Sequence, residues 1–417
     1  MKFVPTVVVC AVAAVFAFGS ASRCHAEAQL LIDAATGKVL HAENATYPWY
    51  PASVTKLMTI YTTLKAIRDG KVTMDTLLTV SKNAAAQAPT KMGFKVGTTV
   101  TIDNALKMLM VKSANDMAVT IAEGVGGSID GFADMMNANA HALGMTQSNF
   151  VNPNGLPADN HYTSARDLAM LARALIREFP QYDMYWHISS IRYGKRVYHN
   201  YNKLIDYYPG ADGMKTGFIC ASGYNLVGSA TRNGRRLIAV ILGSYSGAVR
   251  TQKAAKLLES GFNNSALSWL TPSLGTVDQL KPIDAAPPNL RDEMCGGHRR
   301  KPASEDNDEE DQTASGDGNP NYQLSALKPA NDKFVLSATP LISPEPITVF
   351  TGPRDHPDSV EQTATAAKKV VHKKKAVAAK TDAAPATADV ARKPAPAKKP
   401  AAKKEPAKKE KSAAASQ

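Results

Sequence analysis

The sequence has little cysteine and lacks the histidine pattern of a metalloprotease. Its 417 residues include four cysteines, and two of them, Cys10 and Cys24, fall near the N-terminus. None of the nine histidines belongs to a His-Glu-x-x-His segment, the spacing that places two zinc ligands on one face of a helix. We therefore expect neither a metal nor another cofactor, so any chemistry must come from the side chains themselves.

The sequence also lacks an apolar run long enough to cross a membrane. The apolar stretch over residues 4–18 is shorter than the roughly 20 residues of a spanning helix. We predict that residues 1–26 are an export signal cleaved after Ala26, with an uncleaved membrane anchor as the alternative. A lipoprotein site at Cys24 is disfavoured because Arg23 stands where a small residue is expected. Cleavage predicts a protein that is periplasmic or secreted to the cell envelope, either soluble or peripheral to the membrane.

Export changes the interpretation of the remaining cysteines. Cleavage would leave only Cys220 and Cys295 in the mature chain. An oxidising compartment permits a disulfide between them. Pairing cannot be deduced from sequence alone, so two free thiols stay as the alternative.

Most of the net positive charge belongs to the C-terminal end. The formal net charge is +12, but residues 361–417 hold 15 Lys and Arg against five Asp and Glu, which leaves only +2 for the rest. Residues 352–417 are mostly Ala, Lys and Pro, which cannot bury a core, so we predict a disordered tail. We expect this tail to contact an anionic cell-wall polymer or a membrane surface, with a solvated tail that binds nothing as the alternative. No nucleic-acid partner is expected.

The chain between the signal and the tail divides into a folded part and a linker. Strand patterns lie at both ends of residues 27–270 with helical patterns between them, which predicts an α/β (α+β) domain with an antiparallel sheet flanked by helices. The N-terminal hairpin is expected to pair with the C-terminal strands. Residues 271–351 are predicted to be a mostly irregular linker with an acidic run at 305–311. The predicted strands cover 29–33, 39–42, 190–198, 213–219, 225–230 and 236–242, and the predicted helices cover 104–123, 128–143, 164–179 and 249–262.

Local signals mark several element ends. Asp103 is expected to cap the helix over 104–123, and Ser164 with Asp167 resembles a capping box. Asn233-Gly234 predicts a two-residue hairpin turn. Residues 149–157 are dense in turn-forming residues and predict an ordered loop.

A serine and a lysine three residues apart open the first helical pattern. In Ser53-Val54-Thr55-Lys56 both side chains would share one helix face, one turn apart, so the amine reaches the hydroxyl. Apolar residues from Leu57 to Ile67 continue at helical spacing, and Gly70 offers a stop. Ser325 and Lys328 have the same spacing, but no partner motif follows them, so we interpret that match as linker.

Two further motifs supply what such a pair needs. A serine hydroxyl is a weak nucleophile, and lysine becomes its base when a desolvated, cation-rich site lowers the lysine pKa. Lys215-Thr216-Gly217, on a predicted strand, gives a second cation, a hydroxyl and a glycine that allows close backbone approach. Ser113-Ala114-Asn115 gives groups that relay a proton and hold an amide. Each residue alone would more often be an ordinary surface or packing residue, but the set predicts an acyl-transfer site.

In this order the three motifs resemble those of the penicillin-binding proteins and serine β-lactamases. The likeness extends over residues 27–265 and is closest to the low-molecular-mass D-alanyl-D-alanine carboxypeptidases. It implies a penicillin-binding protein fold and a serine peptidase that removes the terminal D-alanine from peptidoglycan pentapeptides, with β-lactams as covalent inhibitors. The flanks that carry the likeness are residues 51–59, Asn115-Asp116, residues 152–157 and residues 212–218.

The resemblance implies a role for each motif residue. Ser53 would attack the D-Ala-D-Ala carbonyl while Lys56 takes its proton. The N–H groups of Ser53 and of the strand near Phe218 would stabilise the oxyanion. Ser113 would pass a proton to the leaving D-alanine. The substrate-binding residues would be Asn115 for the amide, and Lys215, Thr216, Gly217 and Arg250 at the carboxylate end.

Rival functions share parts of this pattern. A D,D-endopeptidase that cuts cross-links would carry every motif, whereas a non-catalytic cell-wall binding protein would be expected to lose Ser53 or Lys56. A β-lactamase fits less well because residues 116–214 contain no Glu-x-x-Leu-Asn segment to supply a deacylating base. The family often carries a second β-rich domain and a C-terminal amphipathic helix, for which the Lys-Ala-Pro tail offers no apolar face. Phe218 stands where some relatives have a polar residue.

Overall fold

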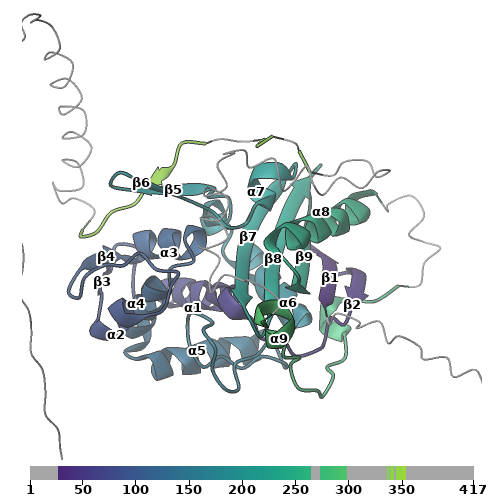
Figure 1. Ribbon diagram of the computed structural model, residues 1–417, viewed down its shortest axis with the longest axis horizontal. Helices are drawn as coiled ribbons and strands as arrows, with labels where there is room; N and C mark the ends of the chain where they lie inside the picture. The colour runs from purple at the N-terminus through teal and green to yellow at the C-terminus, as the bar shows by residue number, and fades with distance from the viewer. Residues whose placement is uncertain (1–26, 264–272, 298–335, 338, 342–343, 354–417) are drawn as a thin grey trace, which may run out of the picture. The chain divides into compact units, whose positions relative to one another are not determined.

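The structure is a computed structural model that describes residues 27–263, 273–297, 336–337, 339–341 and 344–353 (Figure 1). The predicted export signal, the acidic run, the second Ser-x-x-Lys match and the chain beyond residue 353 lie outside these residues. The domain boundaries at residues 26, 270 and 351 stay predictions.

A five-stranded antiparallel sheet forms one half of the described domain. Its order is β2-β1-β9-β8-β7, so the N-terminal hairpin pairs with the C-terminal strands, as predicted. Leu30 pairs with Val240 in the β1–β9 ladder, and Asn233 and Gly234 have the positive φ angles of the predicted turn. The strands are β1 (Ala28–Asp33), β2 (Val39–Glu43), β7 (Ala211–Ile219), β8 (Gly223–Arg232) and β9 (Arg235–Ser244).

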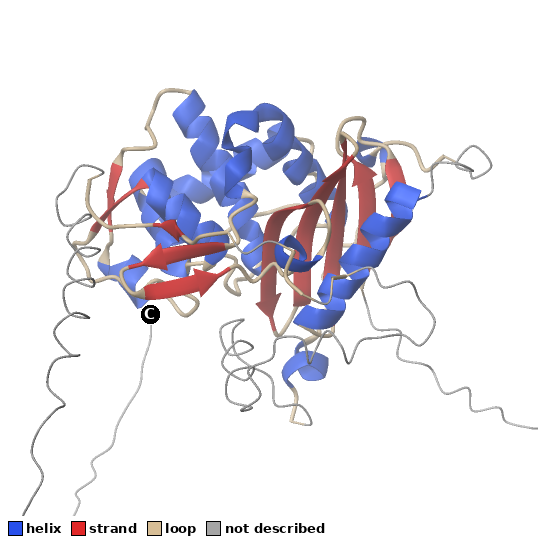
Figure 2. Ribbon diagram, turned by 90° about the horizontal axis from the view of Figure 1, so that it is seen from above, coloured by secondary structure: helices blue, strands red, loops and turns tan. Residues whose placement is uncertain are grey.

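Alternating side chains bury both faces of this sheet. On β1, Leu31 joins an apolar cluster with α8 (Gly247–Asn263), whereas its neighbour Leu30 joins the main core with α6 (Ala165–Glu178). Figure 2 shows the sheet between α8 on one side and the helical half of the domain on the other. The predicted class, an antiparallel sheet flanked by helices, is therefore confirmed.

Helices form the other half of the domain, at the left of Figure 1. A short 3-10 helix over Ala52–Thr55 leads into α1, which ends just before Gly70, as predicted. Ser128 and Ser164 cap α5 and α6 by accepting backbone N–H bonds from Gly131 and Asp167. The remaining helices include α1 (Lys56–Arg68), α2 (Lys82–Ala86), α3 (Ile102–Val111), α4 (Asn115–Gly126), α5 (Ile129–Ala142), α7 (Leu204–Tyr207) and the 3-10 helix over Pro180–Tyr185.

The helix predicted over 104–123 is wrong in two respects. It is two helices, α3 and α4, because Ser113 takes the left-handed backbone conformation, with φ of 57°, and interrupts the helical path. Thr101, and not Asp103, caps α3, since the Thr101 side chain accepts a hydrogen bond from the Asn104 N–H. The break places a polar motif at a corner between two buried helices.

Short strands complete the described part of the chain. The single strand predicted over 190–198 is a hairpin, because Gly194, with φ of 57°, turns the chain between β5 and β6. No sequence pattern predicted β3 and β4, which pair with each other. These strands are β3 (Leu77–Thr79), β4 (Thr99–Thr101), β5 (Ser190–Tyr193), β6 (Arg196–His199) and β10 (Ile347–Thr348), which pairs with β5 in parallel.

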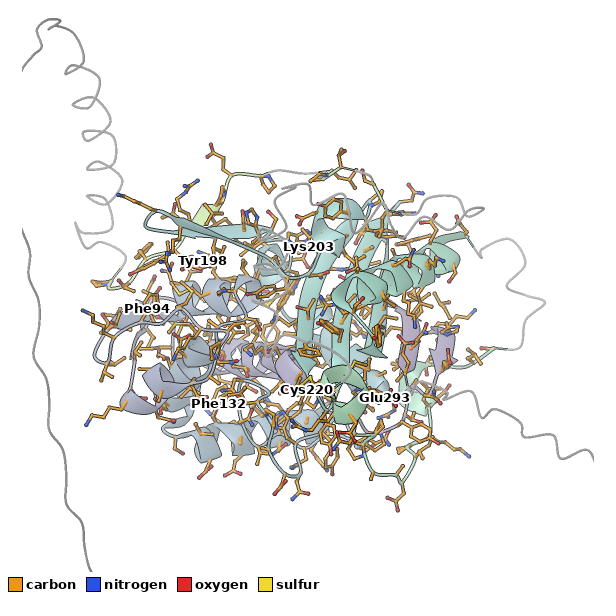
Figure 3. All side chains as sticks on the ribbon, in the orientation of Figure 1. Phe94, Phe132, Tyr198, Lys203, Cys220 and Glu293 are labelled. Atoms are coloured by element: carbon orange, nitrogen blue, oxygen red, sulfur yellow. A yellow bond between two sulfur atoms is a disulfide. The ribbon has the colours of Figure 1, made fainter. Side chains whose placement is uncertain are left out.

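A disulfide fixes one end of residues 273–297 to the sheet. Cys220, just beyond β7, bonds to Cys295 at the end of α9 (Arg291–Cys295), which decides between the two alternatives for these cysteines. Figure 3 labels Cys220 beside α9. The Leu290 N–H donates to the Ala221 carbonyl at 3.0 Å, so a backbone hydrogen bond joins the same two segments as the disulfide.

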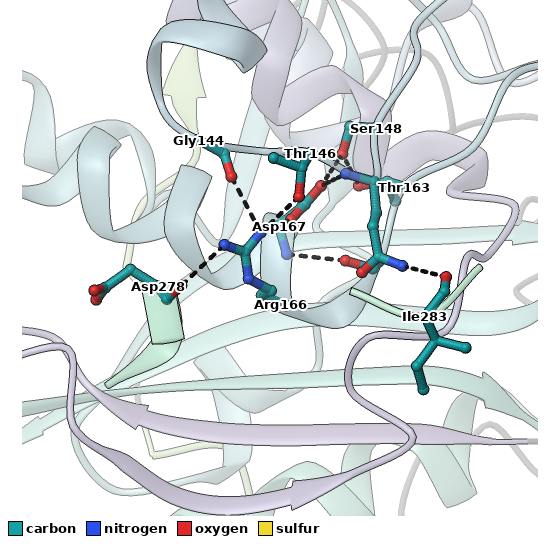
Figure 4. Close-up of polar contacts among 10 residues, drawn as sticks. Gly144, Thr146, Ser148, Thr163, Arg166, Asp167, Asp278 and Ile283 are labelled. Atoms are coloured by element: carbon teal, nitrogen blue, oxygen red, sulfur yellow. Dashed lines mark hydrogen bonds and ion pairs between the residues drawn. The ribbon is translucent and has the colours of Figure 1, made fainter. Parts of the chain in front are cut away.

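A buried ion pair attaches the same segment to the helical half (Figure 4). Arg166 lies 2.7 Å from the Asp167 carboxylate and also donates to the Asp278 carbonyl in the 3-10 helix over Val277–Gln279. Burial raises the pKa of the Asp167 carboxyl, while hydrogen bonds from Ser148 and from the Gln147 N–H oppose that shift.

No helix among the described residues has the length and apolarity needed to cross a membrane.

Candidate active site

Ser53 and Lys56 stand at the start of a buried helix with their functional atoms in contact. Lys56 Nζ lies 2.9 Å from Ser53 Oγ. The Lys56 side chain is fully buried, and its amine also donates to Asn115 Oδ1 at 2.7 Å and to the Asn154 carbonyl at 2.6 Å. Ser53 is partly exposed. A substrate therefore reaches the hydroxyl while the amine behind it is shielded, the arrangement in which lysine accepts a serine proton.

The sheet holds this segment in place. Asn225 of β8 donates its side-chain amide to the carbonyls of Tyr50 and Pro51, at 3.0 and 3.1 Å, just before Ser53. Gly217 of β7 packs directly against the nucleophile segment, since a Cβ on Gly217 would lie 2.6 Å from Ser53 N. The predicted reason for this glycine was room for a substrate backbone. The structure adds a second reason, close contact between the two halves of the site.

Ser113 and Asn115 flank the corner between α3 and α4. Ser113 is buried, and its Oγ has no hydrogen-bond partner among the described residues. An unpaired buried hydroxyl is available for proton transfer, which fits the predicted relay role. Asn115 accepts a hydrogen bond from Lys56 and donates from Nδ2 to the Ala88 carbonyl at 2.9 Å. Asn115 therefore positions the lysine, while its contact with a substrate amide stays a prediction.

A loop that no sequence pattern predicted covers this corner. The Asp116 carboxylate accepts N–H bonds from Met92 at 3.1 Å and from Gly93 at 2.9 Å. Thr90 links the same loop to the motif, because its hydroxyl donates to the Ser113 carbonyl at 2.9 Å. Burial raises the pKa of the Asp116 carboxyl, and the backbone donors oppose that shift. Asp116 thus holds the loop against the Ser113 corner.

The loop rich in turn formers supplies the third acceptor for the buried amine. That acceptor is the Asn154 carbonyl, and the neighbouring Pro153 carbonyl accepts the Thr59 hydroxyl of α1 at 2.6 Å. Gly155 has φ of +80°, and a Cβ there would lie 1.8 Å from the Ala52 carbonyl oxygen, so only glycine fits. The sequence predicted an ordered loop but did not assign Asn154 to the site.

Lys215 and Thr216 lie on β7, the sheet edge that contacts the 3-10 helix of Ser53. Both are buried, and Lys215 Nζ donates to the Thr216 carbonyl at 3.1 Å. Arg250 of α8 donates to the Asn225 carbonyl at 3.2 Å. Asn225 pairs with Gly217, which directly follows the predicted carboxylate ligands Lys215 and Thr216 on β7. The Arg250 guanidinium therefore contacts the residue of β8 that lies opposite Gly217.

A buried histidine that no sequence pattern singled out lies behind the Ser-x-x-Lys segment. His161 Nε2 is 2.9 Å from Thr55 Oγ1. Burial, together with the positive charge of Lys56, lowers the pKa of His161 to about 4. The imidazole is therefore neutral at neutral pH.

Known proteins are similar to this chain in sequence and in fold. A family model described as D-alanyl-D-alanine carboxypeptidase matches residues 16–246. The D-alanyl-D-alanine carboxypeptidase DacC of Escherichia coli K12 is 36% identical over 244 residues, which cover 57% of this chain and 61% of the relative. The crystal structure of penicillin binding protein 6B from Escherichia coli is 36% identical, covers 58% of this chain and 78% of that chain, and has a TM-score of 0.55. Penicillin-binding protein D2 from Listeria monocytogenes, in its cefotaxime-bound form, is 28% identical, covers 57% of this chain and 96% of that chain, and has a TM-score of 0.52.

The matched region and the site coincide. This chain spans about three-fifths of the length of its Escherichia coli relative DacC. The family match takes in more than half of the chain and contains every predicted site residue except Arg250. Ser53, Lys56 and Asn115, which the family resemblance singled out, meet in one hydrogen-bonded group. The chain therefore belongs to the D-alanyl-D-alanine carboxypeptidase family.

Proposed function

We propose that this chain is a serine-type D-alanyl-D-alanine carboxypeptidase that trims peptidoglycan stem peptides and is acylated by β-lactams. The observation that carries the proposal is the 2.9 Å contact between the buried Lys56 amine and the partly exposed Ser53 hydroxyl. Family membership supports the substrate class, and the cefotaxime-bound Listeria relative supports the inhibitor class.

Acylation starts at Ser53. Its Oγ forms a bond to the carbonyl carbon of the terminal D-Ala-D-Ala peptide, and its proton passes to the Lys56 amine. Backbone N–H groups of Ser53 and of β7 near Phe218 stabilise the oxyanion, a contribution of about 2.7–4 kcal/mol per donor in other enzymes. The C–N bond then breaks, and the D-alanine amine takes a proton delivered through Ser113.

Substrate binding and deacylation complete the cycle. Lys215 and Thr216 bind the free carboxylate of the terminal D-alanine, and Arg250 adds positive potential. After D-alanine leaves, water attacks the ester on Ser53 while Lys56 again accepts a proton. Cleavage of the ester releases the shortened peptide and restores the serine hydroxyl.

Release of D-alanine from a purified pentapeptide muropeptide tests this proposal. Wild-type protein should release D-alanine, Ser53→Ala should not, and Ser128→Ala, at an exposed helix cap, should behave as wild type. Cleavage of a cross-linked dimer without release of D-alanine would instead indicate an endopeptidase. Absence of both reactions, with binding to cell-wall material retained, would indicate a non-catalytic binding protein.

We also propose that the mature protein works in the periplasm and that its basic tail contacts an anionic cell-wall polymer or membrane surface. The predicted cleavage after Ala26 and the Cys220–Cys295 disulfide support an oxidising compartment outside the cytoplasm. The charge of residues 361–417 supports the tail contact. Removing residues 352–417 should weaken co-sedimentation with cell-wall material at low salt. Unchanged sedimentation across a salt series would contradict an electrostatic contact.

A further inference from the structure

A closed loop packs against the segment that carries the nucleophile. Residues 149–163 form this loop, and an antiparallel backbone bridge between Asn149 and Tyr162 closes it. His161 lies inside this loop, 3% exposed, in edge-to-face contact with the Phe150 ring at 5.9 Å between centroids. The proposed mechanism assigns this buried side chain no role.

Hydrogen bonds at both ring nitrogens fix the tautomer of His161. Nδ1 accepts the Val151 N–H at 3.0 Å, so Nδ1 carries no proton. Nε2 therefore carries the proton and donates to Thr55 Oγ1 at 2.9 Å. Neutral imidazole is the form that makes both bonds, and the lowered pKa of His161 keeps it in that form at neutral pH.

One hydrogen-bond partner of His161 precedes the Lys56 backbone, and the other belongs to the loop that contacts the Lys56 amine. Thr55 directly precedes Lys56 and is the N-cap residue of α1, so it sets where the lysine side chain leaves the backbone. Val151 belongs to the loop whose Asn154 carbonyl accepts a hydrogen bond from Lys56 Nζ at 2.6 Å. One side chain therefore connects the backbone that carries the base to the loop that carries its acceptor.

We propose that His161 is a positioning residue for Lys56, which holds the amine against Ser53 Oγ through its hydrogen bond to Thr55. This inference rests on the proposed function, because it assigns His161 to the acylation step. Displacing a reacting group by about 1 Å costs enzymes about 100-fold in rate. Loss of the Thr55 contact should therefore slow acylation more than it lowers stability.

Two variants separate this role from simple packing. The amide nitrogen of glutamine reaches the place of Nε2, so His161→Gln keeps the bond to Thr55. The amide oxygen of asparagine reaches the place of Nδ1, so His161→Asn keeps only the bond to Val151. Each variant loses one of the two ring hydrogen bonds, so a merely structural role predicts equal stability and equal rates for both.

The measurement is the second-order rate constant for labelling by a fluorescent penicillin, taken across pH, with the thermal midpoint of each variant. We expect His161→Gln to label within about threefold of wild type, and His161→Asn to label about 10 to 100 times more slowly with a displaced pH profile. Thr55→Val removes the same bond from the other side and should match His161→Asn, whereas Thr55→Ser should match wild type. The double variant His161→Asn with Thr55→Val should be no slower than either single variant.

Two failures are distinguishable in this experiment. Equal labelling rates for His161→Gln and His161→Asn, or rates that follow the thermal midpoints, would overturn the role of His161 and leave the proposed function intact. A wild-type protein that takes up no penicillin would overturn the proposed function, and this inference with it.

Discussion

The site has two walls that are held in different ways. Hydrogen bonds from the Lys56 side chain hold the helical wall, which consists of Ser53, Lys56, Ser113, Asn115 and Asn154. Backbone hydrogen bonds hold the strand wall, which consists of Lys215 to Gly217 on β7. Lys56 Nζ has acceptors on three segments far apart in the sequence. By contrast, β7 pairs with β8 from Ala211 to Ile219, and the disulfide at Cys220 fixes the chain just beyond it.

This difference follows from what each wall must do. Proton transfer depends on a few atoms placed within hydrogen-bond reach, so each buried bond on the helical wall carries a large share of the function. On the strand wall, the proposed carboxylate ligands Lys215 and Thr216 lie on a strand whose position is set by many ladder bonds together. Loss of one supporting contact should therefore cost activity on the helical wall, whereas loss of one contact that supports the strand wall should cost mainly stability.

The largest effect should come from the lysine of the helical wall. Lys56→Ala removes the base and should slow acylation by penicillin about 10⁴- to 10⁶-fold, the range for deletion of a single triad member in other serine hydrolases. Lys65→Ala, further along the same helix and only partly buried, is the matched control and should stay within a few-fold of wild type. Stopped-flow labelling measures both. A Lys56→Ala rate within tenfold of wild type would show that another group is the base.

Removal of the disulfide beside the strand wall should have the next largest effect, and it should lower stability without lowering activity. The disulfide closes a loop with a sequence separation of 75, so Cys220→Ser with Cys295→Ser should lower the free energy of unfolding by about 3–4 kcal/mol. The acylation rate should stay within about threefold, because the β7–β8 ladder keeps Lys215 in place. Denaturant titration and penicillin labelling test the pair of expectations. A rate that collapses while the protein stays folded would mean that the disulfide, and not the ladder, positions β7.

A pH effect of about 3 kcal/mol is expected from His161, which lies behind the helical wall. Histidine in an unfolded chain has a pKa of about 6.5, whereas burial and Lys56 lower the pKa of folded His161 to about 4. As pH falls from about 6.5 to about 4, the unfolded chain binds a proton that the folded chain does not, so the free energy of unfolding falls by up to about 3 kcal/mol. Urea titrations at neutral pH and near pH 4 should show a smaller decrease for His161→Gln. Equal decreases in both proteins would mean that another group titrates.

The smallest effect should come from the loop that covers the Ser113 corner. Asp116→Asn replaces one of two accepting carboxylate oxygens by an NH2 group, a donor that faces either the Met92 N–H or the Gly93 N–H, so the free energy of unfolding should fall by about 2 kcal/mol. Asp130→Asn, in the exposed first turn of α5, should change stability by less than about 1 kcal/mol. Denaturant titration compares the two. Equal, small changes would show that Asp116 does not hold the loop.

Elements with strong local signals were predicted well from the sequence. The Asn233-Gly234 turn, the Ser164 cap and the pairing of β1 with β9 are all present in the structure. The motifs are short strings whose spacing already places Ser53 beside Lys56, so this part of the site was predictable. The fold class follows from the same alternation of strands and helices.

The features missed by prediction depend on contacts between distant segments. The break at Ser113 arises where the chain corner packs under the loop from Thr90 to Gly93, against the apolar helical pattern on both sides. Asn154 contributes a backbone carbonyl, which carries no sequence signal. His161 is one of nine histidines, and only burial and the contact with Thr55 distinguish it.

The central claim, that Ser53 is the nucleophile activated by Lys56, is tested most directly by mapping a β-lactam adduct. Intact-mass analysis after incubation with penicillin should show one adduct per chain, and peptide mapping should place it on Ser53 and find none in Ser53→Ala. An adduct on Ser113 or on any other residue, or a wild-type chain that stays unmodified, would contradict the account.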